Sequence, residues 1–168
     1  SIVPSTDTVG HGTFLASIAA GSQDGAYLGA APESELVIVK LKKARDYYLK
    51  KYLIPPEQEN AFESTAVMVG IDYIIRKAKD LGRPAAICIG LGTNTGSHAG
   101  NSIFAEYMEA VSCLSGICLC VAAGNESQAG HHFLGDLPTQ EASQAVELRV
   151  GENAGDIYMN MWNTASDR

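Results

Sequence analysis

The sequence is poor in charged and aromatic residues, and these shortages exclude several classes of protein. Charged residues make up 18% of the 168 positions and aromatic residues 7%, whereas hydrophobic residues reach 46%. That composition excludes a disordered chain and is sufficient for one buried core. The net charge of -7 argues against nucleic acid or an anionic membrane surface as a partner. No uninterrupted apolar run is long enough to cross a bilayer.

Cysteine is also scarce, with single residues at positions 88, 113, 118 and 120. Cys118 and Cys120 are two apart in a predicted strand, so their side chains point to the same face. Their neighbours are apolar, and no histidine or acidic residue shares their spacing. We therefore expect buried, reduced thiols rather than a zinc site or a disulfide, and the cysteines leave the cellular compartment open.

The chain contains a histidine between two glycines, in the sequence Val-Gly-His-Gly-Thr at positions 9–13. His11 starts a predicted apolar helix that ends at Gly21, where we expect a left-handed stop. The positive end of the helix dipole disfavours a protonated imidazole, so His11 is suited to act as a base. Asp7 and Thr13 can satisfy free amides of the first turn. Taken alone, such a histidine is more often a surface cap than a catalyst.

Continuous apolar runs and helical periodicity together predict an α/β fold. Strands are expected at 36–40, 85–89 and 117–122, and their lack of alternation indicates burial on both faces of a parallel sheet. Helices are expected at 60–81, capped by Asn60 with Glu63, and at 101–114. Their predicted buried stripes are Val67, Ile71, Ile74, Ile75 and Ala78 in the first helix, and Ile103, Tyr107, Val111 and Leu114 in the second. The predicted architecture is a three-layer open parallel sheet.

Two further segments have more than one interpretation. Residues 40–62 form an unusually long connection, and six of the twelve basic residues lie between Lys40 and Lys51. This segment either docks an acidic partner or propeptide or simply faces water, and the second is the commoner role of a charge run. The glycine-rich segment 90–100 could be a dinucleotide loop, but its spacing does not fit G-x-G-x-x-G. It could instead accept an extended peptide against bare backbone.

The last predicted strand is followed by a candidate site residue, by two adjacent histidines and by a segment with a different sequence pattern. Asn125 leaves that strand at the edge where such folds place their chemistry, although an ordinary Gly-Asn turn is the alternative. The adjacent His131 and His132 cannot easily bind one ion together, so no metal is expected. After Pro138, Val146, Leu148 and Val150 alternate with polar residues, and 157–162 follows a turn. This pattern predicts a half-buried hairpin that begins a β domain.

Four sequence blocks, in order, resemble the subtilisin-like serine peptidases. The block from His11 to Gly21 is similar to that family's histidine block, and Ala-Gly-Asn at 123–125 to its oxyanion block. Between them, Gly-Ala-Ala-Pro at 29–32 resembles a Gly-Val-Ala-Pro turn, and Ile-Gly-Leu-Gly at 89–92 a Ser-Leu-Gly segment. The segments 91–100, 124–126 and 131–132 narrow the resemblance to clostridial Csp-type germination proteases.

The resemblance implies a function and a set of site residues. His11 would be the general base and Asn125 the side-chain donor to the oxyanion, while Gly90, Leu91 and Gly92, with Val37, Val39 and Leu41 opposite, would hold the substrate backbone. It implies a protein or peptide substrate and an extracytoplasmic or spore-associated location. The residues themselves predict no cofactor and no metal. Residues 1–138 would be part of a peptidase domain, and 139–168 the start of a β-sandwich insert.

The sequence also departs from the family pattern. The aspartate block would lie before Ser1 and the serine block after Arg168, so we expect the interior of a longer chain, inactive by itself, with exposed sheet edges that favour homo-oligomers. Asp7 lacks the Asp-Thr-Gly context and is not assigned to the triad, and Ser17 replaces a usual glycine. A peptide-binding pseudoprotease of the same fold and a nucleotide-binding domain are the alternatives.

Overall fold

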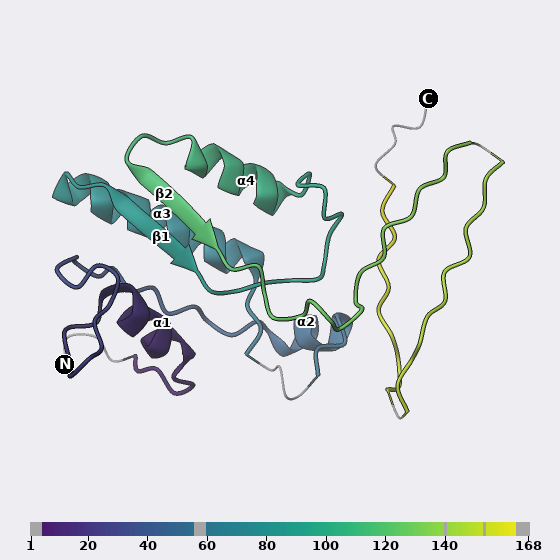
Figure 1. Ribbon diagram of the computed structural model, residues 1–168, viewed down its shortest axis with the longest axis horizontal. Helices are drawn as coiled ribbons and strands as arrows, with labels where there is room; N and C mark the ends of the chain where they lie inside the picture. Colours follow the sequence, from purple (N-terminus) through teal and green to yellow (C-terminus); the bar gives the residue numbers. More distant parts are fainter. Residues whose placement is uncertain (1–4, 56–59, 140, 153, 164–168) are drawn as a thin grey trace.

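The computed structural model describes residues 5–55, 60–139, 141–152 and 154–163; the Ser-Ile-Val-Pro start lies outside them. Figure 1 shows α3, β1, α4 and β2 grouped together, with α1 and α2 beside them and the yellow-green segment after residue 140 projecting away. The elements, in chain order, are α1 (His11–Ala20), α2 (Asp46–Lys51), α3 (Ser64–Leu81), β1 (Ala85–Ile89), α4 (Ile103–Ser112) and β2 (Ile117–Val121).

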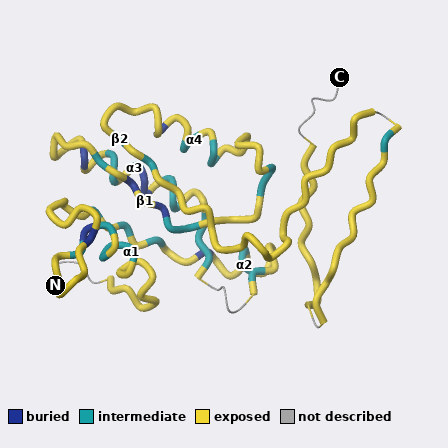
Figure 2. Tube along the Cα trace, viewed as in Figure 1, coloured by how far each residue is buried: buried dark blue, intermediate teal, exposed yellow. Residues whose placement is uncertain are grey.

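The core lies where two helices cover one face of a parallel sheet. β1 and β2 pair in parallel, from Ala85 opposite Ile117 to Ile89 opposite Val121, and α4 connects them. Every second strand residue faces the helices, because side chains alternate along a strand. The buried cluster, visible in dark blue in Figure 2, consists of Ile71 from α3, Ile87 and Ile89 from β1, and Val111 from α4. Ile71 is 2% exposed.

Helix α3 confirms the helical periodicity, although it begins later than the sequence predicts. Its predicted stripe is buried or half-buried, and Gly82 ends the helix in the left-handed region at φ 63°. The helix starts at Ser64 instead of residue 60, and Glu63 makes no side-chain cap. The residues just before the helix pair with another segment of the chain, since the Ala44 amide donates to the Ala61 carbonyl at 2.8 Å. That extended contact prevents an earlier start.

The ends of α1 and α4 differ from the expected ones in instructive ways. The predicted left-handed stop at Gly21 is wrong, because Gly21 is extended, with φ -62° and ψ 138°. The chain continues outward and returns at residues 29–31, whose amides donate to the carbonyls of Gly21, Ile18 and Ala19 at 2.8–3.0 Å. The Gly-Ala-Ala-Pro turn thus caps α1 from a distance. Helix α4 starts after Ser102, whose Oγ accepts the amide of Ala105.

The buried stripe predicted for α4 is only partly present. Val111 is buried, whereas Ile103, at the first turn, is 79% exposed. Tyr107 is half-buried, and its hydroxyl donates to the Met68 carbonyl of α3 at 3.1 Å. The two helices therefore pack together through the middle and the end of α4, and its first turn is left exposed.

The predicted strand at 36–40 is wrong in this structure. The segment is extended, but within the described residues no backbone hydrogen bond joins positions 36–41 to another part of the chain. Val39 and Leu41 are half-buried against α3, while Ile38 and Lys40 face outward. Side-chain packing holds this segment, and a strand additionally requires a hydrogen-bonded neighbour. The observed sheet therefore has two strands where the sequence predicts three.

One helix layer covers the sheet where the sequence predicts two. The strand residues that point away from α3 and α4, including Cys88, Cys118 and Cys120, are exposed. The prediction of buried thiols is therefore wrong: alternation places these side chains on the uncovered face. Cys118 Sγ and Cys120 Sγ are 3.9 Å apart on that face, and neither forms a disulfide.

The predicted hairpin in the C-terminal region does not form among the described residues, and the start of a β sandwich is not shown. Positions 146–150 and 157–162 carry no strand assignment, and the turn expected between them includes residue 153, which lies outside the described residues. The apolar residues are exposed instead of half-buried, with Met161 91% exposed. A two-stranded ribbon with no layer to cover it is marginal, which accounts for the difference.

Candidate active site

A tight turn presents His11 at the start of α1. Gly10, just before the helix, adopts a left-handed conformation at φ 89°. The Asp7 carboxylate accepts the amides of Val9, Gly10 and Thr13 at 2.8–3.0 Å, and the Thr13 hydroxyl at 2.7 Å. These bonds, led by the one from the Gly10 amide, hold the pKa of Asp7 well below its usual range. The predicted role of Asp7 in satisfying the first-turn amides is confirmed.

Asp7 organises this turn without acting as the acid partner of His11. Its hydrogen bonds among the described residues all go to Val9, Gly10 and Thr13, and none reaches the imidazole. The carboxylate also lies at the positive end of the α1 dipole, which it shares with His11. This geometry is consistent with a role for Asp7 outside the triad.

His11 lies against the residue that follows β1. A methyl group placed on Gly90 would be 3.5 Å from His11 Cε1 and 2.2 Å from Leu15 Cδ1. The absence of a side chain at Gly90 leaves the space that the tip of the Leu15 side chain occupies at the end of the strand. The consequence is that His11, near the start of the chain, is held at the carboxyl end of β1. His11 is itself exposed.

Asn125 follows the carboxyl end of the neighbouring strand. The Ala122 amide donates to the Ile89 carbonyl at 3.0 Å, which extends the pairing of the two strands by one residue. Gly124 then turns the chain at φ 87°. Since β1 and β2 are parallel and in register, His11 and Asn125 are both near the same edge of the sheet. No hydrogen bond joins their side chains, and Asn125 is exposed.

The residues expected to hold a substrate divide into two groups. Gly90 and Leu91 are half-buried, with Leu91 packed against the core, while Gly92 is exposed with open space around its Cα. Val39 and Leu41, by contrast, point toward α3, where an added methyl on Gly70 would meet Val39 Cγ1 at 3.1 Å. Val37 is half-buried in the same extended segment.

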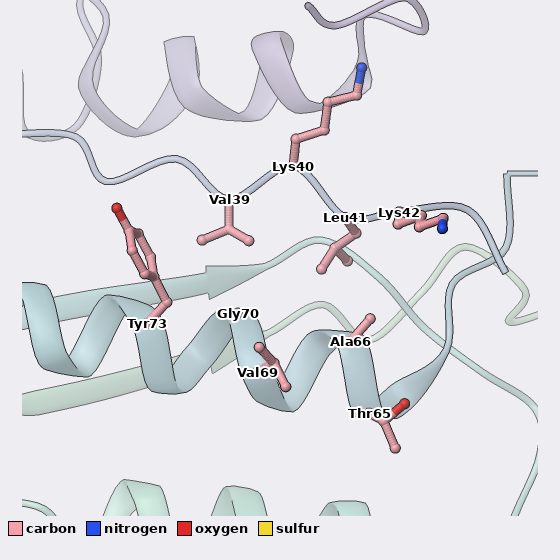
Figure 3. Close-up of a pocket in the computed structure, with 9 residues that line it drawn as sticks. All are labelled: Val39, Lys40, Leu41, Lys42, Thr65, Ala66, Val69, Gly70 and Tyr73. Atoms are coloured by element: carbon pink, nitrogen blue, oxygen red, sulfur yellow. The ribbon is translucent and has the colours of Figure 1, made fainter. Parts of the chain in front are cut away.

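A groove of about 470 Å³ lies between this segment and α3. In Figure 3, Val39 and Leu41 point from the segment toward the helix. Thr65, Val69 and Tyr73 line its helix side. Neither His11 nor Asn125 lines this groove. The groove and the carboxyl edge of the sheet are therefore separate features of the molecule.

A polar cluster that the sequence did not assign to the site lies beside Asn125. Glu126 Oε2 accepts a hydrogen bond from Asn94 Nδ2 and lies 2.9 Å from His131 Nδ1. The His98 and His132 rings stack with centroids 4.3 Å apart. Within the described ranges, no group of three or more His, Cys, Asp or Glu side chains is arranged to hold a metal ion. The signal that could have found the cluster is that polar loops follow two adjacent parallel strands.

Comparison with solved structures finds that the fold of this chain is similar to that of a protease. The chain is similar to the solved structure of the Clostridium perfringens CspB protease, with 32% sequence identity and a TM-score of 0.64. The chain has a protease-related fold. The match covers 76% of this chain and 25% of the CspB chain, so the sequence spans about a quarter of that protease. No protein-family model and no curated protein sequence matches significantly.

The similarity supports a loose relationship to the Csp type and a partial subtilisin-like fold. It agrees with the mixed α/β architecture and its small parallel sheet.

No helix among the described residues has the length and apolarity that a membrane span requires.

Proposed function

We propose that this chain is the part of a subtilisin-like serine endopeptidase that supplies the general base and one oxyanion donor. The observation that carries the proposal is the position of His11 against Gly90, at the sheet edge near which Asn125 follows the neighbouring strand. The similarity to a Csp protease supports it independently. The exposure of both side chains leaves them accessible to a peptide.

In the proposed mechanism, His11 takes the proton from a serine hydroxyl as the serine oxygen attacks the peptide carbonyl. It then returns that proton to the departing amine. The carboxamide of Asn125 donates a hydrogen bond to the oxyanion, where a preorganised donor is most effective. The serine and the acid partner of His11 are contributed by parts of the protein outside residues 1–168, and the chain alone is therefore inactive.

The same proposal assigns the substrate and the domains. The Gly90–Gly92 backbone hydrogen-bonds an extended peptide, and the opposite segment, with Val37, Val39 and Leu41, completes the clamp. Open space at Gly92 supports this assignment, as does the lack of any backbone hydrogen bond between residues 36–41 and the rest of the described chain. Residues 1–138 belong to the peptidase domain, and 139–168 begin an inserted β domain.

The test uses the full-length protein and a casein or peptide substrate. We expect His11→Ala to abolish peptidase activity, and Asn125→Ala to lower kcat by about 10²–10³-fold, a magnitude measured in subtilisin for loss of one oxyanion donor. Asn160→Ala, an exposed asparagine in the projecting segment, is the matched control and should retain activity. Unchanged kcat in the Asn125→Ala protein would contradict the proposed site.

A serine-directed phosphonate probe distinguishes the remaining possibilities. It should label the full-length protein and leave the 168-residue chain unlabelled, because the nucleophile is proposed to lie outside it. Labelling of the 168-residue chain would refute the proposal that this chain lacks the nucleophile and is inactive by itself. Peptide binding without labelling of the full-length protein would instead identify a pseudoprotease.

A further inference from the structure

Two loops leave the same edge of the sheet and meet through their side chains. The first follows β1 and carries Asn94, and the second follows β2 and carries Glu126 and His131. Within the described residues, no backbone-to-backbone hydrogen bond involves positions 91–101. The geometry of the first loop therefore depends on its side chains.

The Glu126 carboxylate is the centre of the contact between the loops. One of its oxygens accepts from Asn94 Nδ2 and lies 2.9 Å from His131 Nδ1, while the two nitrogens are 3.3 Å apart. Two donors thus converge on a single oxygen, an arrangement that requires His131 to carry its hydrogen on Nδ1. The bonds from Asn94 and then His131 lower the pKa of Glu126, so the carboxylate is ionised at neutral pH.

A second contact joins the same two loops without using Glu126. The His98 and His132 rings stack at a centroid distance of 4.3 Å and an interplanar angle of 21°. His98 Nε2 also lies 3.3 Å from the Asn94 carbonyl, which folds the first loop back on itself. The two loops are therefore joined at two places, by one polar hub and one ring stack.

From these contacts we infer that Asn94, Glu126 and His131 are positioning residues, which fix the Gly90–Gly92 backbone relative to the side chain of Asn125. The inference rests on the proposed function. Glu126 directly follows Asn125, so a bond from Glu126 to the opposite loop restrains the proposed oxyanion donor. Such a donor must lie about 2.7–3.1 Å from the oxyanion. A misplacement of about 1 Å can cost about 10²-fold in rate.

The first arm of the test measures the loops themselves by NMR in the 168-residue chain, at a concentration at which sedimentation shows a monomer. We expect Glu126→Ala to lower the backbone order parameters of residues 93–99, which lie in the opposite loop. Glu126→Gln retains an acceptor oxygen and should restore most of the order. Glu147→Ala, an exposed acidic residue of the projecting segment, is the control and should leave residues 93–99 unchanged. Unchanged order in the Glu126→Ala chain would overturn the inference.

The second arm measures catalysis in the full-length protein. We expect Glu126→Ala to lower kcat by about 10²-fold with a smaller change in KM, since the oxyanion donor acts in the transition state. Asn94→Ala combined with Glu126→Ala should lose little more than Glu126→Ala alone, because the two residues form one contact. Unchanged kcat in Glu126→Ala would overturn the positioning role. An inactive wild-type protein would refute the proposed function, while the order parameters would still decide whether Glu126 joins the loops.

Discussion

Gly90 shows how a single residue brings distant parts of this chain together. A side chain at this position would overlap Leu15 of α1 and contact His11. The glycine does not serve backbone freedom here, because its φ is not positive. It serves close approach, which lets a helix near the start of the chain rest on the end of β1.

Replacing Gly90 with a larger residue should displace the tip of the Leu15 side chain and loosen the packing of α1 on the end of β1. We predict that Gly90→Ala lowers the free energy of unfolding by about 1–3 kcal/mol, the usual cost of an overpacked contact. Urea denaturation measures this as a lower midpoint at an unchanged slope. Gly92→Ala is the control, since a methyl group there meets nothing within 4 Å, and it should stay within about 0.5 kcal/mol of the wild type. Equal stability of both variants would argue that α1 does not rest on Gly90.

At the scale of one element, α1 depends on partners from outside the helix at both ends. Asp7 binds the amides of its first turn, and residues 29–31 bind carbonyls of its last turn. A helix of ten residues is marginal alone in water, so these partners contribute to its formation. The Asp7 contribution carries a pH dependence, because its bonds favour the ionised carboxylate.

The direction of that dependence follows from the lowered pKa of Asp7. The folded chain holds this carboxyl ionised at a pH where the unfolded chain protonates it, so its stabilisation is present above about pH 4 and is lost as the pH falls further. We predict that the drop in Tm between pH 7 and pH 3 is smaller for Asp7→Ala than for the wild type. Thermal unfolding followed by circular dichroism at the two pH values measures this change in Tm. Asp136→Ala should behave like the wild type, and an identical drop in the Asp7→Ala chain would contradict the prediction.

The elements also show which features a sequence can predict. Helix α3 is predictable because its stripe repeats along the helix and Gly82 ends it locally. Whether residues 36–41 form a strand is not predictable in this way, since an apolar run does not specify which segment will be its hydrogen-bonded neighbour. The exposure of the cysteines is not predictable for a similar reason. Their burial would require a second layer of structure on the other face of the sheet, and the strand sequences do not specify one. His11 and Asn125 are proposed as site residues from short sequence blocks, whereas the contact of Asn94 with Glu126 requires the register of two strands.

At the scale of the whole molecule, several apolar surfaces have no cover. The sheet face with the cysteines is exposed, and the extended segment 36–41 presents Ile38, which is 65% exposed. Among the described residues, the backbone of this segment has no hydrogen-bonded partner in another part of the chain. The projecting segment adds exposed apolar residues such as Met161 and Trp162. Large uncovered apolar areas beside free backbone edges favour association between chains.

We predict that the 168-residue chain self-associates and that residues 36–41 contribute most to the contact. Sedimentation velocity over a hundredfold range of concentration should show a rising average mass. Ile38→Lys should lower the association constant at least tenfold, because a charge beside unpaired backbone opposes edge pairing. Ile103→Lys is the matched control: Ile103 is 79% exposed, but it lies in the first turn of a helix, which offers no extended edge for strand pairing, so association should persist. A monomer at all concentrations, or equal effects of both substitutions, would show that residues 36–41 do not form the main contact between chains.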